Sequence, residues 1–479
     1  MRYNTLECIL PLPQKRIHGH GKLFCSNIAR INGSSKAEAA VDILQKTFQM
    51  LEHPLNSREG AGINFIEQAM KEDAYRINIS ENGIEIISGN PRGFFYAAAA
   101  LNQMLLCAVR EGFAGSFLDT GSVEDFPRFA WRGFMLDSAR HYQSADFIKS
   151  FLYMLALHRI NVFHWHLSDN QSWRIDLQCL PGLAGSGTLN DGVYTREDIK
   201  SITALAAQLG IAIVPEIDVP GHSEMLLKKF PQYQCDPHAE HCREFCLGNP
   251  AGSELIKKIF DELLELFPDS KFIHIGGDEA AVEHWQQCPR CQQAMREKNL
   301  TDLRALENDF MQQIANHIVR HNRTPILWGG GAPSSLTYDS SAVIQAWLDI
   351  REPIKLSANG NNIIYSVHNS LYFDYPANQH EPQKNWMFEL SERGVYLTDP
   401  YMVWQEKVED HLLGVEACLW TETIPQWRVF SKLLSRLNAY SEAAWSNQIE
   451  RNFDDFLRRE NYLAAAGYSD LIKTLCAQN

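Results

Sequence analysis

Polar and aromatic side chains gather at the ends of a series of short apolar runs in this sequence. One run is followed by two glycines and then by Asp278 and Glu279, an adjacent pair of carboxylates. Other runs end in Trp328, Trp347 and Trp420 or are followed by Arg140, Asp169, His222, Tyr372, Asp374 and Glu422. Aromatic faces with carboxylate edges suit a sugar, because a sugar ring has apolar C–H faces and a rim of hydroxyl groups. The residues therefore predict a carbohydrate site.

Each of these residues has a simpler explanation when it is taken alone. A Trp at the end of a strand is more often part of the core, and a lone His is usually a structural group. We assign His164 and His166 to the structural class. The functional interpretation is favoured because seven of the eight run ends share the same bias. Stability alone gives no reason to concentrate charges and indoles there.

The elements that must position these side chains are eight apolar runs, most of them separated by helical patterns. The runs are Arg132 to Leu136, Asn161 to His166, Ile211 to Ile217, Phe272 to Ile275, Pro325 to Trp328, Ala342 to Trp347, Asn362 to Val367 and Gly414 to Trp420. The helical patterns are clearest at Ala145 to Leu157, Arg196 to Leu209, Gly252 to Phe267 and Leu303 to Arg320. Alternation of strand and helix predicts a parallel sheet, and eight strands close a (β/α)8 TIM barrel. In such barrels the active site forms at the carboxyl ends of the strands, where the polar residues stand.

A small α/β domain is predicted to precede the barrel. The alternating runs Tyr75 to Ile79 and Gly83 to Ile87 indicate a hairpin, and the Ala-rich segment Phe94 to Ala108 indicates a buried helix packed on that sheet. We therefore divide the chain into an α/β domain at 1–126 and a catalytic barrel at 127–479. The barrel ends in a helical extension that begins at Gln426 and closes against it.

Composition excludes several classes of function. The chain has 479 residues, of which 45% are hydrophobic, and 44 Lys and Arg stand against 58 Asp and Glu, so the net charge is −14. That sign disfavours nucleic acid and anionic membranes as partners. The most apolar stretch, Phe94 to Val109, is interrupted by Asn102 and Gln103 and is too short to span a bilayer. No secretory signal follows Met1, and eleven scattered cysteines fit a reducing compartment, so we expect a cytoplasmic protein.

A family resemblance rests on the segment His274-Ile275-Gly276-Gly277-Asp278-Glu279. It resembles the His-x-Gly-Gly-Asp-Glu signature of the family 20 glycoside hydrolases, the β-N-acetylhexosaminidases, and falls on the fourth strand as it does there. Further elements follow in family order: Asn161 to Asp169, Pro220-Gly221-His222, Tyr372-Phe373-Asp374 and Trp420-Thr421-Glu422. The resemblance covers about residues 130 to 446, and the amino-terminal domain is also similar to the one that usually precedes this barrel.

The resemblance implies an exo-acting, retaining enzyme that removes terminal N-acetylglucosamine or N-acetylgalactosamine from β-linked glycans and glycoconjugates. Catalysis is substrate-assisted: the 2-acetamido oxygen attacks the anomeric carbon and gives an oxazolinium intermediate. Glu279 is then the general acid and base, a role that calls for a raised pKa, and Asp278 accepts the acetamide N–H. Tyr372 holds the acetamide oxygen in position for attack. No cofactor and no catalytic metal are implied.

The same resemblance implies roles for the substrate-binding residues. Arg140 binds the O3 and O4 hydroxyls, and Glu422 reads O4 and O6. Trp328 and Trp347 wall the acetamide pocket, Trp420 lies under the sugar ring, and Asp374 joins the acetamide pocket or the leaving-group side. Asp169 and His222 form a pair behind the site that orients or tunes Glu279.

Two other functions remain alternatives. A carbohydrate-binding protein on an inactive barrel is disfavoured because Asp278, Glu279 and Tyr372 are all present. Metal-dependent hydrolysis through His164, His166 and Asp169 would require metal-dependent activity. The sequence leaves open the choice between gluco and galacto substrates, the aglycone, the physiological glycan and the oligomeric state.

Cysteines cluster around a C-x-x-C motif formed by Cys288 and Cys291. Cys235, Cys242 and Cys246 lie in the loop after the third strand. If the loops after strands three and four are adjacent, Cys235, Cys246, Cys288 and Cys291 could hold a structural Zn²⁺ ion. We favour free cysteines, because the sequence lacks a second C-x-x-C.

Overall fold

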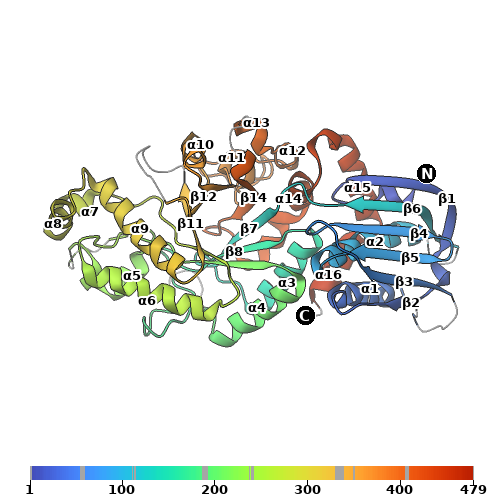
Figure 1. The fold of residues 1–479 in the computed structure, drawn as a ribbon, viewed down its shortest axis with the longest axis horizontal. Helices are drawn as coiled ribbons and strands as arrows, with labels where there is room; N and C mark the ends of the chain where they lie inside the picture. Colours follow the sequence, from blue (N-terminus) through green and yellow to red (C-terminus); the bar gives the residue numbers. More distant parts are fainter. Residues whose placement is uncertain are drawn as a thin grey trace.

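The computed structural model describes residues 3–477 apart from 54, 56–59, 111, 113–114, 186–191, 237, 239–241, 330–338, 349–350 and 405–408. A sheet domain, built from the amino-terminal residues, lies at one end of the molecule, and a barrel fills the other (Figure 1). This arrangement confirms the predicted fold class, a (β/α)8 barrel preceded by a small α/β domain.

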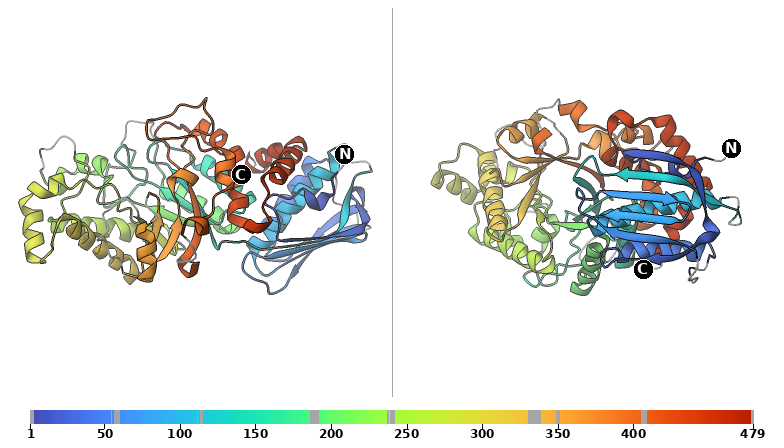
Figure 2. Two further views of the ribbon diagram at one scale, coloured as in Figure 1. Left: turned by 90° about the horizontal axis from the view of Figure 1, so that it is seen from above. Right: turned by 45° about the vertical axis from the view of Figure 1, so that its right-hand side comes forward.

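The amino-terminal domain is a mixed sheet whose described strands lie in the order β1-β6-β4-β5-β3-β2. Their bounds are β1 Lys15–Phe24, β2 Ile28–Asn32, β3 Ala61–Glu67, β4 Tyr75–Ser80, β5 Gly83–Ser88 and β6 Phe117–Asp125. The predicted hairpin is the antiparallel pair β4 and β5. Helices α1 (Glu38–Met50) and α2 (Pro91–Val109) pack together on this sheet (Figure 2). Asn90 caps α2 through the Gly93 N–H, and Pro91 at the first helical position fixes its start.

Eight parallel strands close the barrel within the part of the chain that the structure describes. They are β7 Trp131–Asp137, β8 Val162–His166, β9 Ala212–Glu216, β10 Phe272–His274, β11 Thr324–Gly329, β12 Val343–Ala346, β13 Asn362–Tyr365 and β14 Leu412–Leu419. Each coincides with one of the predicted apolar runs. These strands are mostly buried because one face fills the barrel and the other contacts the helices, although the barrel strands also carry buried polar groups such as His164, Glu216 and Glu416.

The helices between the barrel strands include the four that the sequence predicts. They are α3 Ala145–Leu157, α4 Arg196–Leu209, α6 Pro250–Leu266 and α9 Leu303–Arg320. Their ends follow local capping chemistry: Thr195 and Asp198 form a capping box at the start of α4, and Gly210 ends it with a φ of 71°. Shorter helices lie in the loops, namely α5 Glu224–Lys229, α7 Glu283–Gln287, α8 Pro289–Glu297, α10 Arg351–Ala358, α11 His368–Leu371, α12 Glu392–Tyr396 and α13 Pro400–Trp404.

The carboxyl-terminal helices join the two domains. Helix α14 (Gln426–Trp445) packs on β14 of the barrel, as the predicted extension requires. Helix α15 (Phe453–Ala465) contacts α2, and α16 (Tyr468–Ala477) contacts both α1 and α3. A buried ion pair, Arg132 Nη2 to Asp73 Oδ2 at 2.8 Å, also crosses from the barrel to the sheet domain. The sheet domain therefore packs against the barrel away from the carboxyl ends of the barrel strands.

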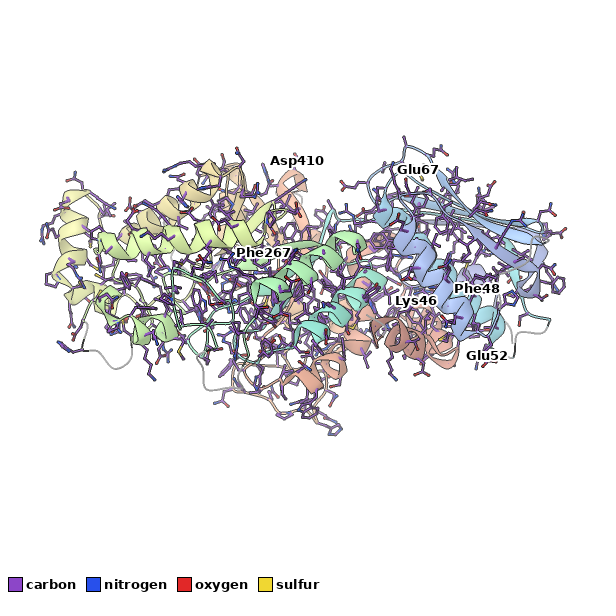
Figure 3. The ribbon with its side chains drawn as sticks, turned by 90° about the horizontal axis from the view of Figure 1, so that it is seen from below. Lys46, Phe48, Glu52, Glu67, Phe267 and Asp410 are labelled. Atoms are coloured by element: carbon purple, nitrogen blue, oxygen red, sulfur yellow. The ribbon has the colours of Figure 1, made fainter. Side chains whose placement is uncertain are left out.

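Apolar side chains fill the interior of both domains, and Figure 3 labels two of them, Phe48 and Phe267. Phe48 of α1 is fully buried in the first domain, and Phe267, next to the end of α6, packs on Trp165 of the barrel with ring centroids 6.2 Å apart. Within the described residues, no helix is both long and apolar enough to cross a membrane.

Candidate active site

A cavity of about 470 Å³ opens at the carboxyl ends of the barrel strands. Its lining includes most of the residues that the sequence singles out: Arg140, His222, Asp278, Glu279, Trp347, Tyr372, Asp374, Trp420 and Glu422. These side chains come from six different strand ends, so closure of the barrel is what brings them together. The volume lies in the range of small-molecule sites.

The two glycines before the carboxylate pair are required by the backbone. Gly276 and Gly277 have φ angles of 70° and 102°, which disfavour other residues. A Cβ atom on Gly276 would lie 1.8 Å from Asp218 Oδ1. Glu279 itself has a φ of 51°, a strained value for a non-glycine residue. The strained turn lets two adjacent carboxylates face the same cavity.

Asp278 is paired with Asp218, a carboxyl group to which sequence reasoning assigned no role. Burial raises the pKa of Asp278 to about 6, and burial together with the charge of Asp278 raises the pKa of Asp218 well above its usual range. Asp218 therefore carries the proton and donates a hydrogen bond to the Asp278 carboxylate, while its Oδ1 accepts from the Gly277 N–H at 3.1 Å. The buried Oδ1 of Asp278 has no partner, so it is an acceptor available to a ligand N–H.

Glu279 lies in line with His222 and Asp169. His222 Nε2 is 3.5 Å from Glu279 Oε2, and His222 Nδ1 is 3.1 Å from Asp169 Oδ1. Burial disfavours a charged His222, but the carboxylate of Asp169 raises the pKa of that imidazole well above its usual range. The hydrogen bond from His222 in turn lowers the pKa of Glu279. This direction is opposite to the raised pKa that the sequence led us to expect, because the Glu279 side chain is 57% exposed and faces a cation.

Arg140 is fixed by a set of acceptors at the edge of the cavity. Its Nη2 lies 2.8 Å from Asp169 Oδ2, and its Nε donates to Gln171 Oε1 at 3.0 Å. Asp137 Oδ2 is 3.3 Å from Nη1. Asp169 thus binds both Arg140 and His222 behind the site, although it does not line the cavity itself. The guanidinium is oriented before any ligand arrives, which lowers the entropic cost of binding.

Trp420 forms an aromatic wall with the residues around it. The Arg140 guanidinium lies 5.1 Å from its ring centre, and the Tyr372 ring centroid lies 6.1 Å away. Trp347 also lines the cavity, and its buried Nε1 has no partner. Trp328 is not a wall of the cavity: it is buried behind Trp420, at 5.9 Å between ring centroids, and donates to Glu216 at 2.7 Å.

Asp374 adds a second carboxyl group with an unsatisfied atom. Burial, and then the charge of Glu422, raises its pKa to about 8, so this carboxyl is mostly protonated at neutral pH and can donate a hydrogen bond. Its buried Oδ1 has no partner. Three buried polar atoms of Asp278, Trp347 and Asp374 therefore await hydrogen bonds, an arrangement typical of a site that binds a polar ligand.

His164 and His166 belong to a buried network under the cavity. Both imidazoles lie within ion-pair distance of Glu216, which also pairs with His274 at 3.0 Å. Burial by itself would raise the pKa of Glu216, but these imidazoles hold it well below its usual range. Neither His164 nor His166 lines the cavity.

Sequence reasoning missed several lining residues besides Asp218. His368 follows β13 and binds the Tyr375 hydroxyl through Nδ1 at 2.7 Å. Trp386, to which the sequence gave no firm role, lies on the rim with its side chain 62% exposed. The strand-end rule could have found Asp218 and His368, because both stand within three residues of a strand end. Nothing in the local sequence marks the rim residues.

We expect His222→Gln to move the bell-shaped pH profile of kcat/KM to higher pH. The imidazolium favours the ionised forms of Glu279 and Asp278, so its loss raises the pKa values of both carboxyl groups. Profiles of both proteins on one substrate whose leaving group needs protonation measure the shift. If kcat/KM fell in the variant but rose and declined at the same pH values as in the wild type, His222 would not set the pKa values of Glu279 and Asp278.

A closed (β/α)8 barrel with paired carboxylates and an aromatic wall at the carboxyl ends of its strands defines the class as a glycoside hydrolase. The family model described as the catalytic domain of glycosyl hydrolase family 20 matches residues 129–448, and the model of domain 2 of that family matches residues 7–126. The chain belongs to glycoside hydrolase family 20.

Relatives support the same assignment. A beta-hexosaminidase of Akkermansia muciniphila is 31% identical over 415 residues, which are 81% of this chain and 83% of that protein. A beta-hexosaminidase of Porphyromonas gingivalis is also 31% identical, over 81% of this chain but only 53% of its own length. Among solved structures, the family 20 exo β-N-acetylglucosaminidase of Vibrio harveyi, in complex with N-acetylglucosamine, has a TM-score of 0.86 at 25% identity and covers 98% of this chain and 78% of its own. The family 20 β-N-acetylhexosaminidase of Streptomyces coelicolor has a TM-score of 0.83 at 25% identity, with 98% and 97% covered.

Proposed function

We propose that this protein is an exo-acting, retaining β-N-acetylhexosaminidase that removes terminal N-acetylglucosamine or N-acetylgalactosamine by substrate-assisted catalysis. The observation that carries the proposal is the buried, unpartnered Oδ1 of Asp278 beside Glu279 in a sugar-sized cavity. An acceptor in that position matches the N–H of a 2-acetamido group. The beta-hexosaminidase of Akkermansia muciniphila and the N-acetylglucosamine complex of the Vibrio harveyi enzyme support a terminal N-acetylhexosamine as the substrate.

The first chemical step forms a bond within the substrate. The acetamide oxygen attacks the anomeric carbon while the glycosidic C–O bond breaks, and Glu279 gives its proton to the departing oxygen. Asp278 accepts the acetamide N–H and stabilises the positive charge that develops there. Tyr372 hydrogen-bonds the acetamide oxygen and keeps it in the attack geometry. Asp218 keeps the Asp278 carboxylate oriented throughout, because its protonated carboxyl group donates a hydrogen bond to that carboxylate.

The second step restores the enzyme. Water attacks the anomeric carbon of the oxazolinium ion from the face that the leaving group vacated, the bond between that carbon and the acetamide oxygen breaks, and Glu279 takes the proton from that water. Two inversions at one carbon give net retention. When a sugar covers Glu279 it removes water from a carboxyl group that is 57% exposed, and this desolvation raises its pKa toward the value that a general acid needs.

In the proposed binding mode, Arg140 and Glu422, which both line the cavity, bind the hydroxyls of the terminal sugar and leave no room for a further residue beyond it. We therefore expect the enzyme to release only monosaccharides from the non-reducing end of a chitin oligomer. Mass spectrometry of early products measures this. An oligomer with its terminal O4 methylated is the matched control and should be resistant. Release of internal disaccharides, or cleavage of the methylated oligomer at the normal rate, would contradict exo action.

We also propose a cytoplasmic location. The support is chemical: Cys235, Cys246, Cys288 and Cys291 lie near one another without being joined by disulfides, which fits a reducing compartment. Fractionation of the source cells, with detection of the protein by antibody, tests this proposal.

A further inference from the structure

We propose that Cys235, Cys246, Cys288 and Cys291 bind one Zn²⁺ ion as four thiolates, and that this ion pins the loop after β9 to the helices that follow the catalytic carboxylates of β10. The site is separate from the sugar cavity and takes no part in the hydrolysis. It goes beyond the proposed function, because no step of the reaction needs a metal.

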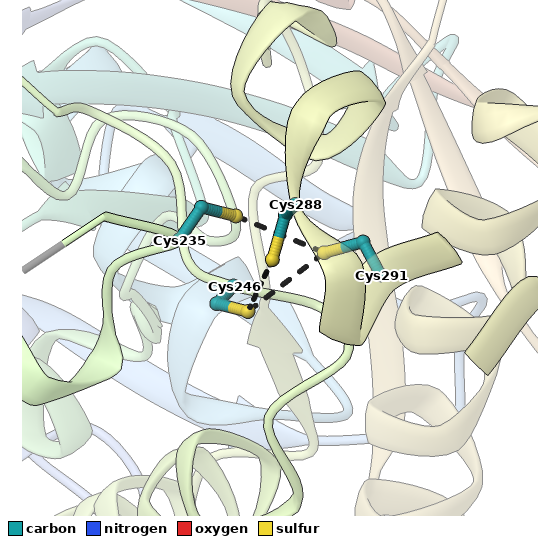
Figure 4. A group of neighbouring side chains, drawn as sticks. All are labelled: Cys235, Cys246, Cys288 and Cys291. Carbon is teal, nitrogen blue, oxygen red and sulfur yellow. Dashed lines mark hydrogen bonds between the residues drawn. The ribbon is translucent and has the colours of Figure 1, made fainter. Parts of the chain in front are cut away.

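The four sulfur atoms already have the spacing of a tetrahedral zinc site. Cys235 Sγ and Cys246 Sγ each lie 3.7 Å from Cys291 Sγ, and Cys246 Sγ lies 3.6 Å from Cys288 Sγ (Figure 4). All four atoms lie within 4.8 Å of one another. A zinc–sulfur bond of about 2.3 Å in a regular tetrahedron places sulfur atoms about 3.8 Å apart. A disulfide would require about 2.05 Å.

The ligands come from two segments that are far apart in sequence. Cys235 and Cys246 lie in the loop between η3 (Pro231–Tyr233) and α6, while Cys288 is the N-cap of α8 and Cys291 lies in its first turn. The expectation of free cysteines rested on the missing second C-x-x-C. The fold supplies the second pair instead, because the loop brings two cysteines eleven residues apart against the single motif.

The surroundings of the four cysteines fit buried thiolates. Cys246, Cys288 and Cys291 are buried, and Cys235 is partly buried. The amino-terminal end of α8 contributes a positive dipole end to two of the ligands. Arg290 lies between Cys288 and Cys291 in the sequence, and its Nη2 donates to the Gln234 carbonyl at 2.6 Å, so a cation is held beside the cluster. The helix end and the Arg290 guanidinium reduce the net negative charge of one Zn²⁺ ion and four thiolates.

The cluster lies where it can stabilise the strained catalytic turns. The loop that carries its first two cysteines also carries Phe245, whose N–H donates to the Pro220 carbonyl at 3.0 Å, two residues before His222. The Phe245 carbonyl accepts from Trp285 Nε1 at 2.8 Å, six residues after Glu279. His222 and Glu279 have φ angles of 49° and 51°, so both turns store strain that neighbouring structure must hold. A zinc ion would tie together the two segments that hold them.

Cys242 is a matched control on the same loop. It is buried, its Sγ donates to the Glu244 carbonyl at 3.3 Å, and it is not one of the four clustered sulfur atoms. A Ser at this position has nearly the size of Cys and can keep the hydrogen bond to the Glu244 carbonyl. If the four clustered cysteines bind the zinc ion, Cys242→Ser should not change the zinc content.

The test is the zinc content of the full chain, purified without chelators from cells grown with zinc, by atomic emission. We expect one zinc per chain in the wild type and in Cys242→Ser. We expect a loss of at least nine-tenths of the metal in the double variant Cys288→Ser, Cys291→Ser. Zinc retained by the double variant would overturn the assignment of these ligands.

A second measurement covers variants that fail to fold. Zinc removal from the wild type with a chelator and a mercurial should lower the Tm, and zinc should restore it. Cobalt(II) added to the apo protein should give the intense visible absorption of tetrahedral thiolate coordination, and the cobalt form should keep the kcat of the zinc form.

A wild type without zinc whose four thiols react freely, or whose mass is lower by four hydrogens because two disulfides have formed, would overturn the proposal. A kcat that depends on the metal bound would overturn a structural role.

Discussion

Glu279→Gln is expected to lower kcat/KM by about 10²–10⁴-fold on natural β-linked oligosaccharides, whose leaving groups are poor. The amide keeps the size of the side chain but cannot give a proton to the departing oxygen. Activated aryl glycosides need little protonation, so the same variant should lose much less activity on 4-nitrophenyl N-acetylglucosaminide. Steady-state kinetics on chitobiose and on the aryl substrate measure the two losses.

The comparison between leaving groups is the control for this prediction. A variant that is merely misfolded loses activity equally on both substrates. Equal losses in a protein with an unchanged Tm would therefore count against Glu279 as the general acid. Addition of azide supplies a second check, because a small anion can replace the water that Glu279 would activate in the second step and rescue turnover of the aryl substrate.

Asp278→Asn is expected to lower kcat by about 10²–10³-fold on all substrates, including activated ones. The variant loses the carboxylate charge that stabilises the positive charge developing on the acetamide in the first step. Single preorganised groups of this kind stabilise a transition state by about 2.7–4 kcal/mol. Asp218→Asn is the matched comparison and should lose much less. Asp218 is already protonated, so an amide there still donates to Asp278 and still accepts from the Gly277 N–H.

The same mechanism predicts that plain β-glucosides are almost inert. The glucoside ring fits the cavity, but the attacking acetamide oxygen is absent, and no carboxylate of the enzyme replaces it. A panel of 4-nitrophenyl β-glycosides with N-acetylglucosamine, N-acetylgalactosamine and glucose measures this directly, and it also determines the gluco or galacto preference. Detection by mass spectrometry of a glycosyl ester on Asp278, Glu279 or Glu422 during turnover would show an enzyme nucleophile and would exclude the mechanism.

The sequence by itself determines the elements and the order in which they occur. Each barrel strand coincides with an apolar run, and α3, α4 and α9 have the bounds that their helical patterns predict. This works because hydrophobic periodicity and capping residues are local: a run buried on both faces favours a strand, and Ser144 or Thr195 marks a helix start. The candidate site follows from the same rule, because parallel strands all end on one side of a barrel.

Only the tertiary structure decides which of these residues contact one another. It places Trp328 behind the cavity wall, and it lowers the pKa of Glu279 where the sequence led us to expect a rise, because His222 approaches from another strand. It also pairs Asp278 with Asp218 and brings Cys235 and Cys246 to the C-x-x-C motif. These outcomes depend on distances of a few ångströms between residues tens of positions apart. Closure of the barrel and packing of its loops fix such distances, whereas the local pattern of a sequence carries no information about them.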